Sequence, residues 1–336
     1  MAGSQQLVLV FGAWNFSGAW SLDVGAFPRV NVIHSATELK PGHRQVCLAI
    51  GVFDGVHLGH QQIIRQTIND ARQHEALALV VTFDKHPNTV VAPDRVPPLI
   101  YSRPQKLRAI EALGGEALLE IPFDKSFSQQ TGEQFIRSLA RDLGKIQSIC
   151  VGADFVFGHQ RSGNVALLKT LGGEIGFQVH GLAAIALDGE TVSSTRIRDT
   201  IRAGDFDAAS QMLGRAYSLA GNVVRGDQLG RKLGFPTANL DTTGLLLPPN
   251  GVYAAHASVE GKSFRAVLNI GLRPTVAQPA APPRVEVHLL EFAGELYGEE
   301  IEVAFAAKLR DEKKFSSLDE LKSQIARDIA EARRRF

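Results

Sequence analysis

The chain has 336 residues, which is long enough for two domains with substantial hydrophobic cores. Its hydrophobic content of 44% and charged content of 21% are those of a soluble globular protein. The formal net charge of +1 and the lack of a long apolar run argue against nucleic-acid binding and against a membrane span. Its two cysteines, Cys47 and Cys150, fall in predicted strands, which favours buried reduced thiols over a disulfide framework or a metal cluster.

Residues 1–29 differ in composition from the rest of the chain, since they hold both tryptophans and only two charged residues. Residues 7–14 imitate the core of a signal peptide, but no Lys or Arg precedes them and no clear cleavage site follows. We therefore predict a poorly ordered extension or a mistaken start site, with a weak surface strand as the alternative. The protein is expected to be cytoplasmic.

The next part of the chain, to about residue 190, alternates between strand and helix patterns. Apolar runs predict strands, and amphipathic stretches predict the helices between them. The strands are expected at 46–50, 77–83, 117–121, 146–151 and 177–182, and the helices at 58–74, 103–113, 131–143 and from 165. This alternation predicts an α/β fold with a doubly wound, Rossmann-like parallel sheet, which we assign to residues 30–200.

A glycine-rich turn joins the first of these strands to its helix. It reads Gly51-Val52-Phe53-Asp54-Gly55-Val56-His57-Leu58-Gly59-His60. Such a turn binds anions well, because free backbone N–H groups and the helix dipole meet there. The glycines permit a tight turn and close approach of a phosphate. His57 and His60, three residues apart, share a helix face and can stabilise a charged transition state.

Two histidines near a helix start can also be metal ligands or surface residues. Within this glycine pattern, however, the turn resembles that of the H-x-G-H nucleotidyltransferase superfamily, and its first half resembles the flavin adenylyltransferase branch. The resemblance implies that His57 and His60 are catalytic. It implies that ATP is bound by Gly51, Phe53, Asp54, Gly55 and Gly59.

Three further loops follow strand ends, where ligands gather in such sheets. The first contains His86 before a proline, and a simple turn explains it as well as a site does. The second runs from Gly152 to Gly163, and its aromatic residues suit a flat ring, although they could also fill the core. The third, 192–198, offers hydroxyl groups and arginines at a helix start, which suits phosphate binding or ordinary capping.

The second half of the chain has a different texture. A helical connector at 201–215 leads to short strands separated by Gly, Pro and Asn, expected at 221–224, 252–259, 264–270, 285–292 and 301–309. This pattern predicts a small antiparallel β-barrel. A C-terminal helix follows, with Leu318, Leu321, Ile325 and Ile329 on the stripe expected to pack across the barrel. We assign residues 216–336 to this second domain.

Residues 226–239 hold the polar groups of this half. The glycine spacing is not that of a P-loop, which argues against a Walker-type NTPase. Glycine N–H groups with the side chains of Arg231 and Lys232 can still surround phosphates, and Thr237 and Asn239 offer oxygen ligands for Mg²⁺. A long surface hairpin is the alternative. In the strand at 285–292, Glu286 is a candidate base directed into the barrel mouth, or a solvated edge residue.

Taken in order, these motifs resemble the family of bacterial bifunctional riboflavin kinases/FAD synthetases over residues 30–334. Those of the second half include Pro236-Thr237-Ala238-Asn239, Asn269-Ile270-Gly271 with Arg273-Pro274-Thr275, and Glu286 with His288. The resemblance implies ATP and riboflavin as substrates, FMN and FAD as products, and Mg²⁺ as the metal. The net charge of +1 gives no case for a nucleic-acid or membrane partner, and the oligomeric state stays open.

The resemblance also assigns residues to each site. In the first domain it implies that FMN is bound by Asp154, Phe155, Phe157 and Arg161, and that ATP is bound also by Ser193, Ser194, Thr195 and Arg196. In the second it implies that ATP is bound by Gly226, Gly230, Arg231, Lys232, Gly234, Thr237 and Asn239, with Thr237 and Asn239 also on Mg²⁺ and Glu286 as the catalytic base. Val52, Lys85 and Asn164 depart from the usual family residues at the motif edges.

Two other functions remain open from the sequence. One is another H-x-G-H transferase, acting on phosphopantetheine, nicotinamide mononucleotide or glycerol phosphate. The predicted barrel with its Pro236-Thr237-Ala238-Asn239 segment argues against it. The other is a non-catalytic flavin- or nucleotide-binding sensor, which would bind these ligands without turnover.

Overall fold

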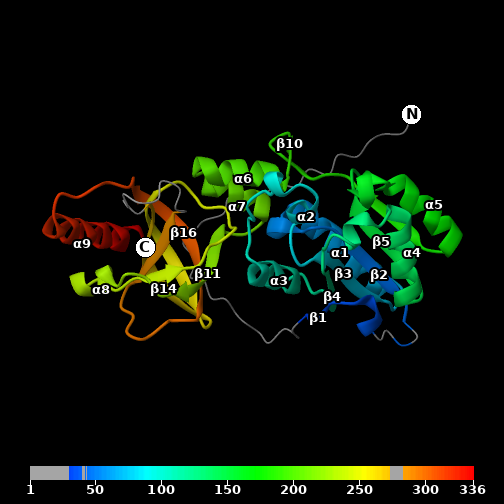
Figure 1. The fold of residues 1–336 in the computed structure, drawn as a ribbon, viewed down its shortest axis with the longest axis horizontal. Coiled ribbons are helices and arrows are strands. Elements are labelled where there is room, and N and C mark those ends of the chain that lie inside the picture. Colours follow the sequence, from blue (N-terminus) through cyan, green and yellow to red (C-terminus); the bar gives the residue numbers. More distant parts are fainter. Residues whose placement is uncertain (1–29, 40–41, 43, 273–282) are drawn as a thin grey trace.

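The structure is a computed structural model that describes residues 30–39, 42, 44–272 and 283–336. One lobe is a parallel sheet with helices on both faces, and the other is a closed barrel with a C-terminal helix (Figure 1). Helices α3 (Arg103–Glu111), α6 (Ser194–Ala203) and α7 (Phe206–Leu213) lie between them in this view. The extension predicted at residues 1–29 lies outside the described residues.

The sheet of the first lobe has six strands in the order β1-β4-β3-β2-β5-β8, and every pairing is parallel. The strands are β1 (Asn31–Ile33), β2 (Val46–Ile50), β3 (Leu77–Phe83), β4 (Ala117–Ile121), β5 (Ile146–Gly152) and β8 (Gln178–Leu182). The predicted doubly wound sheet is confirmed. The edge strand β1 was not predicted, because three residues are too few for a periodic pattern.

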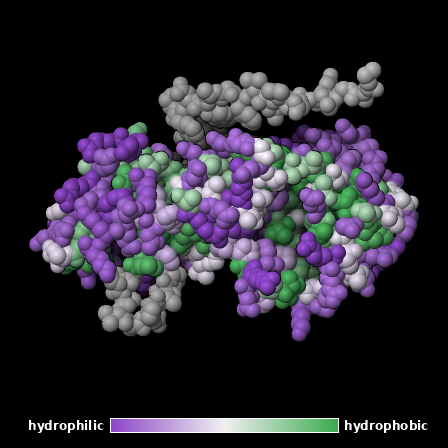
Figure 2. Space-filling model, turned by 90° about the horizontal axis from the view of Figure 1, so that it is seen from above, coloured by the Kyte–Doolittle hydropathy of each residue, from purple (hydrophilic) through white to green (hydrophobic). Residues whose placement is uncertain are grey.

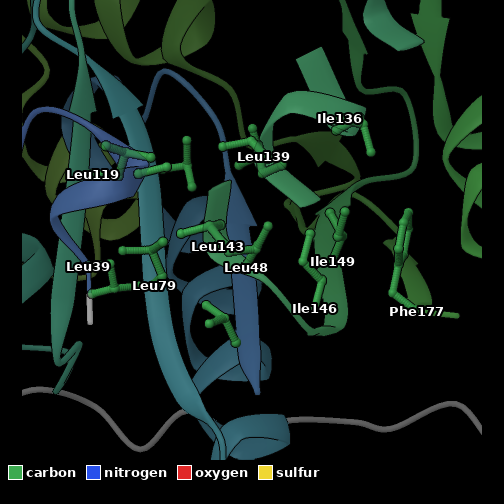
Figure 3. Packing of buried hydrophobic residues seen from close by; sticks show 14 of the residues in the cluster. Leu39, Leu48, Leu79, Leu119, Ile136, Leu139, Leu143, Ile146, Ile149 and Phe177 are labelled. Carbon is green, nitrogen blue, oxygen red and sulfur yellow. The ribbon is translucent and has the colours of Figure 1, made fainter. Parts of the chain in front are cut away.

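Both faces of this sheet are covered, because alternate residues of a strand point to opposite sides. Cys47 and Ala49 pack on the face covered by α1 (Leu58–Gln73) and α3. Leu48 packs on the other face, with α4 (Gly132–Leu143) and α5 (Val165–Ile175). Each fully buried Leu or Ile contributes about 1.5–3 kcal/mol. Figure 3 shows this second core, with Leu48, Leu79 and Leu119 of the sheet near Leu139 and Leu143 of α4.

The second lobe is an antiparallel barrel that closes in the order β11-β12-β15-β14-β13-β16, which confirms the predicted barrel. Its strands are β11 (Ser218–Val224), β12 (Ala238–Leu240), β13 (Gly251–Val259), β14 (Lys262–Gly271), β15 (Arg284–Leu289) and β16 (Glu300–Arg310). Strand β12 was missed, since three residues are too few for a periodic pattern and two of them belong to the stretch interpreted as a ligand loop. The short helix α8 (Leu229–Leu233) precedes it.

The C-terminal helix α9 (Leu318–Arg335) packs on the barrel less tightly than its apolar stripe predicts. Leu318 is 58% exposed, so the prediction that this residue packs against the barrel was wrong. The buried side chains of α9 are instead Ala332 and Asp328, and Asp328 receives three hydrogen bonds from the guanidinium of Arg310 on β16. A bidentate ion pair therefore fastens this helix, with little help from its first turn.

Polar contacts join the two lobes. Arg108 of α3 forms ion pairs with Glu300 and Glu302 of β16. Gln105 of the same helix donates to Ser218 of β11 and to Glu302. Because Gln105 and Ser218 are buried, this contact holds the lobes in one arrangement.

The surface and the cysteines fit the composition. On the face seen in Figure 2, hydrophilic residues surround small, scattered groups of hydrophobic ones. None of the helices in the described ranges combines the length and apolarity that crossing a bilayer requires. Both cysteines are buried and free, as predicted, and burial raises the pKa of the Cys150 thiol to about 12.

Candidate active sites

The first candidate site lies at the carboxyl edge of the parallel sheet. Strands β3, β2 and β5 are neighbours and run parallel, so the loops that follow Phe83, Ile50 and Gly152 all leave the sheet at the same edge. Strand β2 connects through α1 to β3 on one side and pairs with β5 on the other. Ligands in open α/β sheets bind where the strand order reverses in this way.

The histidine turn, residues 51–60, has an unusual backbone. Gly55 has a φ of 75°, as expected of a tight glycine turn, but Phe53 (φ 53°) and Val56 (φ 41°) are left-handed as well. Non-glycine residues rarely adopt this conformation, and a β-branched valine least of all. Gly51 is needed for space, since a Cβ there would lie 2.9 Å from the Phe53 ring. The surrounding structure therefore has to hold the backbone of this turn in its strained conformation, as is common near functional groups.

His57 and His60 form a stacked pair at the start of α1. Their ring centroids lie 3.6 Å apart at 21°, and the edge of Phe53 meets the His60 ring. His57 is the N-cap residue, and its Nδ1 accepts the backbone N–H of His60 at 3.4 Å. A neutral His57 therefore carries its proton on Nε2, where it can donate to a ligand. Gly59 makes room for this arrangement, because a Cβ there would lie 3.3 Å from the His57 ring.

Both imidazoles are held uncharged. Burial, followed by the positive charges of Arg215 and Arg198, lowers the pKa of His57 to about 4. Burial and the neighbouring His57 lower the pKa of His60 well below its usual range, and the His60 Nδ1 has no hydrogen-bond partner among the described residues. Each ring can thus offer one N–H without a charge of its own, and bound phosphates would raise both pKa values.

A cavity of about 420 Å³ opens beside His60. It brings together four of the predicted residues, Asp54, His60, Ser194 and Thr195, together with Val52, His86 and Arg198. It is also lined by Asn88, Arg95 and Pro97, which sequence reasoning missed because the helical turns at Asn88–Val91 and Pro93–Arg95 are too short to show periodicity. Two arginines and two histidines around one polar cavity suit a polyphosphate.

Asp54 organises the cavity wall. Its carboxylate accepts the backbone N–H groups of Ile100 and Tyr101 and forms a buried ion pair with Arg198 of α6. Ser194 donates to the Asp54 carbonyl at 3.0 Å. The carboxylate of Asp54 is thus engaged by protein groups, and it joins the histidine turn to α6.

The arginines of α6 point to different places. Arg198 lines the cavity, whereas the predicted ATP residue Arg196 donates to the carbonyls of Leu187 and Glu190 in the hairpin formed by β9 (Ala186–Leu187) and β10 (Glu190–Thr191). Ser193 caps α6 by accepting the N–H of Arg196. The capping interpretation of this segment is therefore correct for Ser193, and it leaves Ser194 and Thr195 beside the cavity.

The predicted flavin loop follows β5 at the same sheet edge. Phe155 and Phe157 stack on each other with centroids 5.1 Å apart, and both also pack against the core that contains α4. Phe157 lies on Gly163, where a Cβ would be 2.7 Å from its ring. Asp154 and Arg161 are exposed at the rim. Phe155 and Phe157 thus pack against the core and still leave part of their stacked rings accessible to solvent.

The second candidate site is a row of polar side chains on the barrel. Asn239 of β12 is paired with Glu286 of β15, and Glu286 is paired with Asn269 of β14. The barrel core contains Val285 and Val287, so Glu286 between them points to the outer face. The prediction that Glu286 points into the barrel mouth was wrong, because strand alternation separates two faces without saying which is inside.

The loop 226–239 covers this row. His288 Nδ1 lies 2.7 Å from the Pro236 carbonyl, which ties the loop to β15. Gly226 lies against Asn239, since a Cβ at Gly226 would be 2.3 Å from the amide nitrogen. A Cβ at Gly230 would be 2.4 Å from the Phe235 carbonyl oxygen and 3.1 Å from the Thr237 hydroxyl. Arg231 and Lys232 are exposed on α8. The motif residues Arg273, Pro274 and Thr275 lie outside the described residues.

Two protein families match this chain. The FAD synthetase family matches residues 39–196, and the riboflavin kinase family matches residues 213–336. The bifunctional riboflavin kinase/FMN adenylyltransferase of Pseudomonas fluorescens is 37% identical over 307 residues, which cover 90% of this chain and 97% of the relative. The protein of that name from Bacillus subtilis (strain 168) is 34% identical over 311 residues, covering 91% and 98%.

The chain belongs to this bifunctional family. It carries an FMN adenylyltransferase (FAD synthetase) domain followed by a riboflavin kinase domain. A solved structure described as a macrolide-efflux protein from Streptococcus pneumoniae has the same fold, with a TM-score of 0.76 and 28% identity over 91% of this chain and 99% of that one. The likeness spans both lobes, so their arrangement is found in a solved structure as well.

The oxygen groups of the kinase domain fit Mg²⁺. Gly226 lies against the Asn239 amide and Gly230 against the Thr237 hydroxyl, and Asn239 is paired with Glu286 across β12 and β15. Burial, more than the nearby Asp227, raises the pKa of Glu286, while Arg284 opposes the shift. Oxygen ligands of this kind, completed by phosphates and water, are those Mg²⁺ prefers. In the described residues no cluster of three His, Cys, Asp or Glu suggests another metal centre.

The structure also bears on the three family departures. Asn164 caps α5 by accepting the N–H of Leu167, which an aspartate would do as well. Val52 lines the adenylyltransferase cavity, and its carbonyl accepts the Thr82 hydroxyl. Nothing in the structure explains Lys85.

Proposed function

We propose that His57 and His60 are the catalytic pair of the adenylyltransferase domain. The FMN phosphate attacks the α-phosphorus of ATP, a P–O bond forms, and pyrophosphate leaves. The neutral pair donates N–H groups to the oxygens on which charge develops. The observation that supports this most directly is the stacked pair beside a cavity that also holds Arg198 and Arg95.

For the rest of this site we propose the roles implied by the family. ATP lies against the backbone of the glycine-rich histidine turn, with Ser194 and Thr195 near its phosphates. Phe53 is buried within the turn and supports the His60 ring. Asp54, Ser193 and Arg196 support the site through their backbone and hairpin contacts. FMN uses the loop with Asp154, Phe155, Phe157 and Arg161, which leaves the sheet beside the histidine turn.

In the kinase domain we propose that Glu286 accepts the proton of the riboflavin 5′-hydroxyl as that oxygen attacks the γ-phosphorus of a second ATP, and ADP leaves. Its raised pKa suits a base that must hold a proton briefly. Thr237 and Asn239 would hold Mg²⁺, which neutralises charge on the phosphates when bound. Gly226, Gly230, Gly234, Arg231 and Lys232 of the loop would surround those phosphates. We also propose a cytoplasmic location.

Reciprocal variants of the two domains test these roles. In His60→Ala or His57→Ala, formation of FAD from FMN and ATP should fall by about two orders of magnitude or more, because a transition-state donor is lost. Formation of FMN from riboflavin should be unchanged in the same protein. Glu286→Gln should do the reverse. The products are separated by chromatography after incubation with riboflavin or FMN, ATP and Mg²⁺.

Exposed residues of the same type serve as controls. His74→Ala, at the end of α1, and Glu291→Gln, 82% exposed on its side chain, should leave both activities intact. Normal FAD synthesis in both histidine variants would refute their assignment. Normal FMN synthesis in Glu286→Gln would make this glutamate structural.

A further inference from the structure

The chain segment that enters the kinase domain makes direct contact with the histidine turn of the other domain. This segment is the turn Leu213-Gly214-Arg215 between α7 and β11. Arg215 donates to the carbonyls of Gly55 at 2.6 Å and Val56 at 3.0 Å, and also to that of Leu213. Its Nε donates to the Tyr101 hydroxyl, and its guanidinium lies 4.9 Å from the Tyr101 ring centre.

A second side chain, from α1, binds the same carbonyl groups. Gln61 of α1 is buried and donates to the carbonyls of Val56 at 3.0 Å and Leu213 at 2.7 Å. Gly214 closes the contact, since a Cβ there would lie 2.7 Å from the Leu58 side chain. The carbonyls of Val56 and Leu213 are thus each shared by Arg215 and Gln61.

The histidine turn needs such support. Val56, directly before His57, has a left-handed φ of 41°, which its β-branched side chain disfavours. A strained residue persists only where its surroundings fix it. Arg215 bonds the carbonyls of Gly55 and Val56, the two residues that lead into His57. Freed of these bonds, the turn would relax, and the imidazoles would leave their stacked position.

We propose that Arg215 is a positioning residue for adenylyl transfer, supplied from the entry of the kinase domain. It holds the carbonyls of Gly55 and Val56 and thereby sets the direction of His57 and His60. Its guanidinium donates to carbonyl groups of the turn, so we assign its effect to the turn and not to contact with the nucleotide. The inference rests on the proposed catalytic role of the two histidines.

The experiment separates positioning from simple docking of the two domains. Arg215→Met removes all of the hydrogen bonds and the charge. Arg108→Gln breaks the ion pairs to Glu300 and Glu302 between the same lobes, and neither carboxylate belongs to the histidine turn. Kinetics of FAD formation from FMN and ATP are measured for both, and FMN formation from riboflavin in the same protein reports on folding.

For Arg215→Met we expect kcat of FAD formation to fall by about tenfold to a hundredfold, because two charge-assisted bonds to the turn are lost. The KM for ATP should change little, since the histidine donations that are weakened act in the transition state. Arg108→Gln should keep its FAD activity, and both variants should keep kinase activity. Arg215→Lys retains the charge and some donors, and should recover part of kcat.

A pH profile gives a second reading, of the charge that Arg215 places beside the histidine pair. The groups near His57 are Arg215 from the entry turn, Arg198 of α6 with its partner Asp54, and His60 of α1. Loss of a positive neighbour raises the pKa of His57, so the acid limb of kcat/KM for FAD formation should move to higher pH in Arg215→Met. It should stay in place in Arg215→Lys.

Three results would overturn the proposal: normal kcat in Arg215→Met, an equal loss in Arg108→Gln, or an acid limb that does not move. If Arg215→Met also loses kinase activity, the variant is misfolded, and Gln61→Met, which breaks the same Val56–Leu213 link from α1, decides instead. It should lower kcat of FAD formation and spare the kinase. An active His60→Ala would remove the proposed function itself, whereas an inactive His60→Ala with a normal Arg215→Met would remove only this inference.

Discussion

At the scale of single residues, burial decides which groups are charged. His57 and His60 are enclosed and uncharged, so the cationic groups of the adenylyltransferase cavity are Arg95 and Arg198, and Arg198 is paired with Asp54. The histidines can therefore donate directed N–H groups without holding the triphosphate too tightly before the reaction. Glu286 shows the same effect with the opposite sign, since burial raises its pKa toward that of a useful base.

The lowered pKa of His57 predicts a loss of stability in acid. Below its usual pKa of 6.5 the unfolded chain binds a proton that the folded chain refuses until about pH 4. The free energy of unfolding should therefore fall as the pH falls from 6.5 to about 4, with a contribution from His57 of roughly 2 to 3 kcal/mol. Denaturant unfolding at pH 7 and pH 4.5 should show a smaller loss in His57→Gln than in the unchanged chain. Equal losses would mean that His57 is solvated.

At the scale of elements, the sequence predicted what local periodicity determines. The strands at Val46–Ile50 and Leu77–Phe83 and the stripe of α1 are as expected, since each repeats apolar residues over several positions. The three-residue strands β1 and β12 were missed for want of length. The outward direction of Glu286 and the roles of Arg95 and Arg198 depend on contacts between distant segments, which periodicity cannot report.

The loop before β12 allows a test of how an element presents its ligands. In Gly226→Ala the new Cβ would lie 2.3 Å from the Asn239 amide nitrogen and push this side chain out of place. We expect the KM for ATP in FMN formation to rise by about tenfold, in line with the loss of one good contact to the nucleotide or its metal. FAD formation from FMN should be unchanged.

Gly173→Ala is the matched control for this variant. Gly173 lies in α5, and its Cβ would meet nothing within 4 Å, so both activities should be retained. A normal KM in Gly226→Ala would show that Asn239 is not needed for ATP binding. A loss of both activities would indicate a folding defect instead.

At the scale of the whole molecule, the two enzymes are joined by more than a linker. Helix α3 belongs to the adenylyltransferase domain, yet its polar face meets the barrel strands β11 and β16. Glu302 is the centre of this contact, since it accepts from Gln105 and Ser218 and pairs with Arg108. A buried donor that loses its acceptor is costly, so one carboxylate stabilises the arrangement of both lobes.

Glu302→Ala tests this whole-molecule contact. The change leaves the buried Gln105 amide and Ser218 hydroxyl without the acceptor they share, so we expect the free energy of unfolding to fall by about 2 kcal/mol. Glu299→Ala removes an exposed carboxylate nearby and should change stability by no more than about 0.5 kcal/mol. Both are measured by denaturant unfolding followed by circular dichroism. Because Glu302 lies in neither site, both activities should survive at moderate temperature. Equal stability of the two variants would mean that the Glu302 contact does not stabilise the arrangement of the lobes.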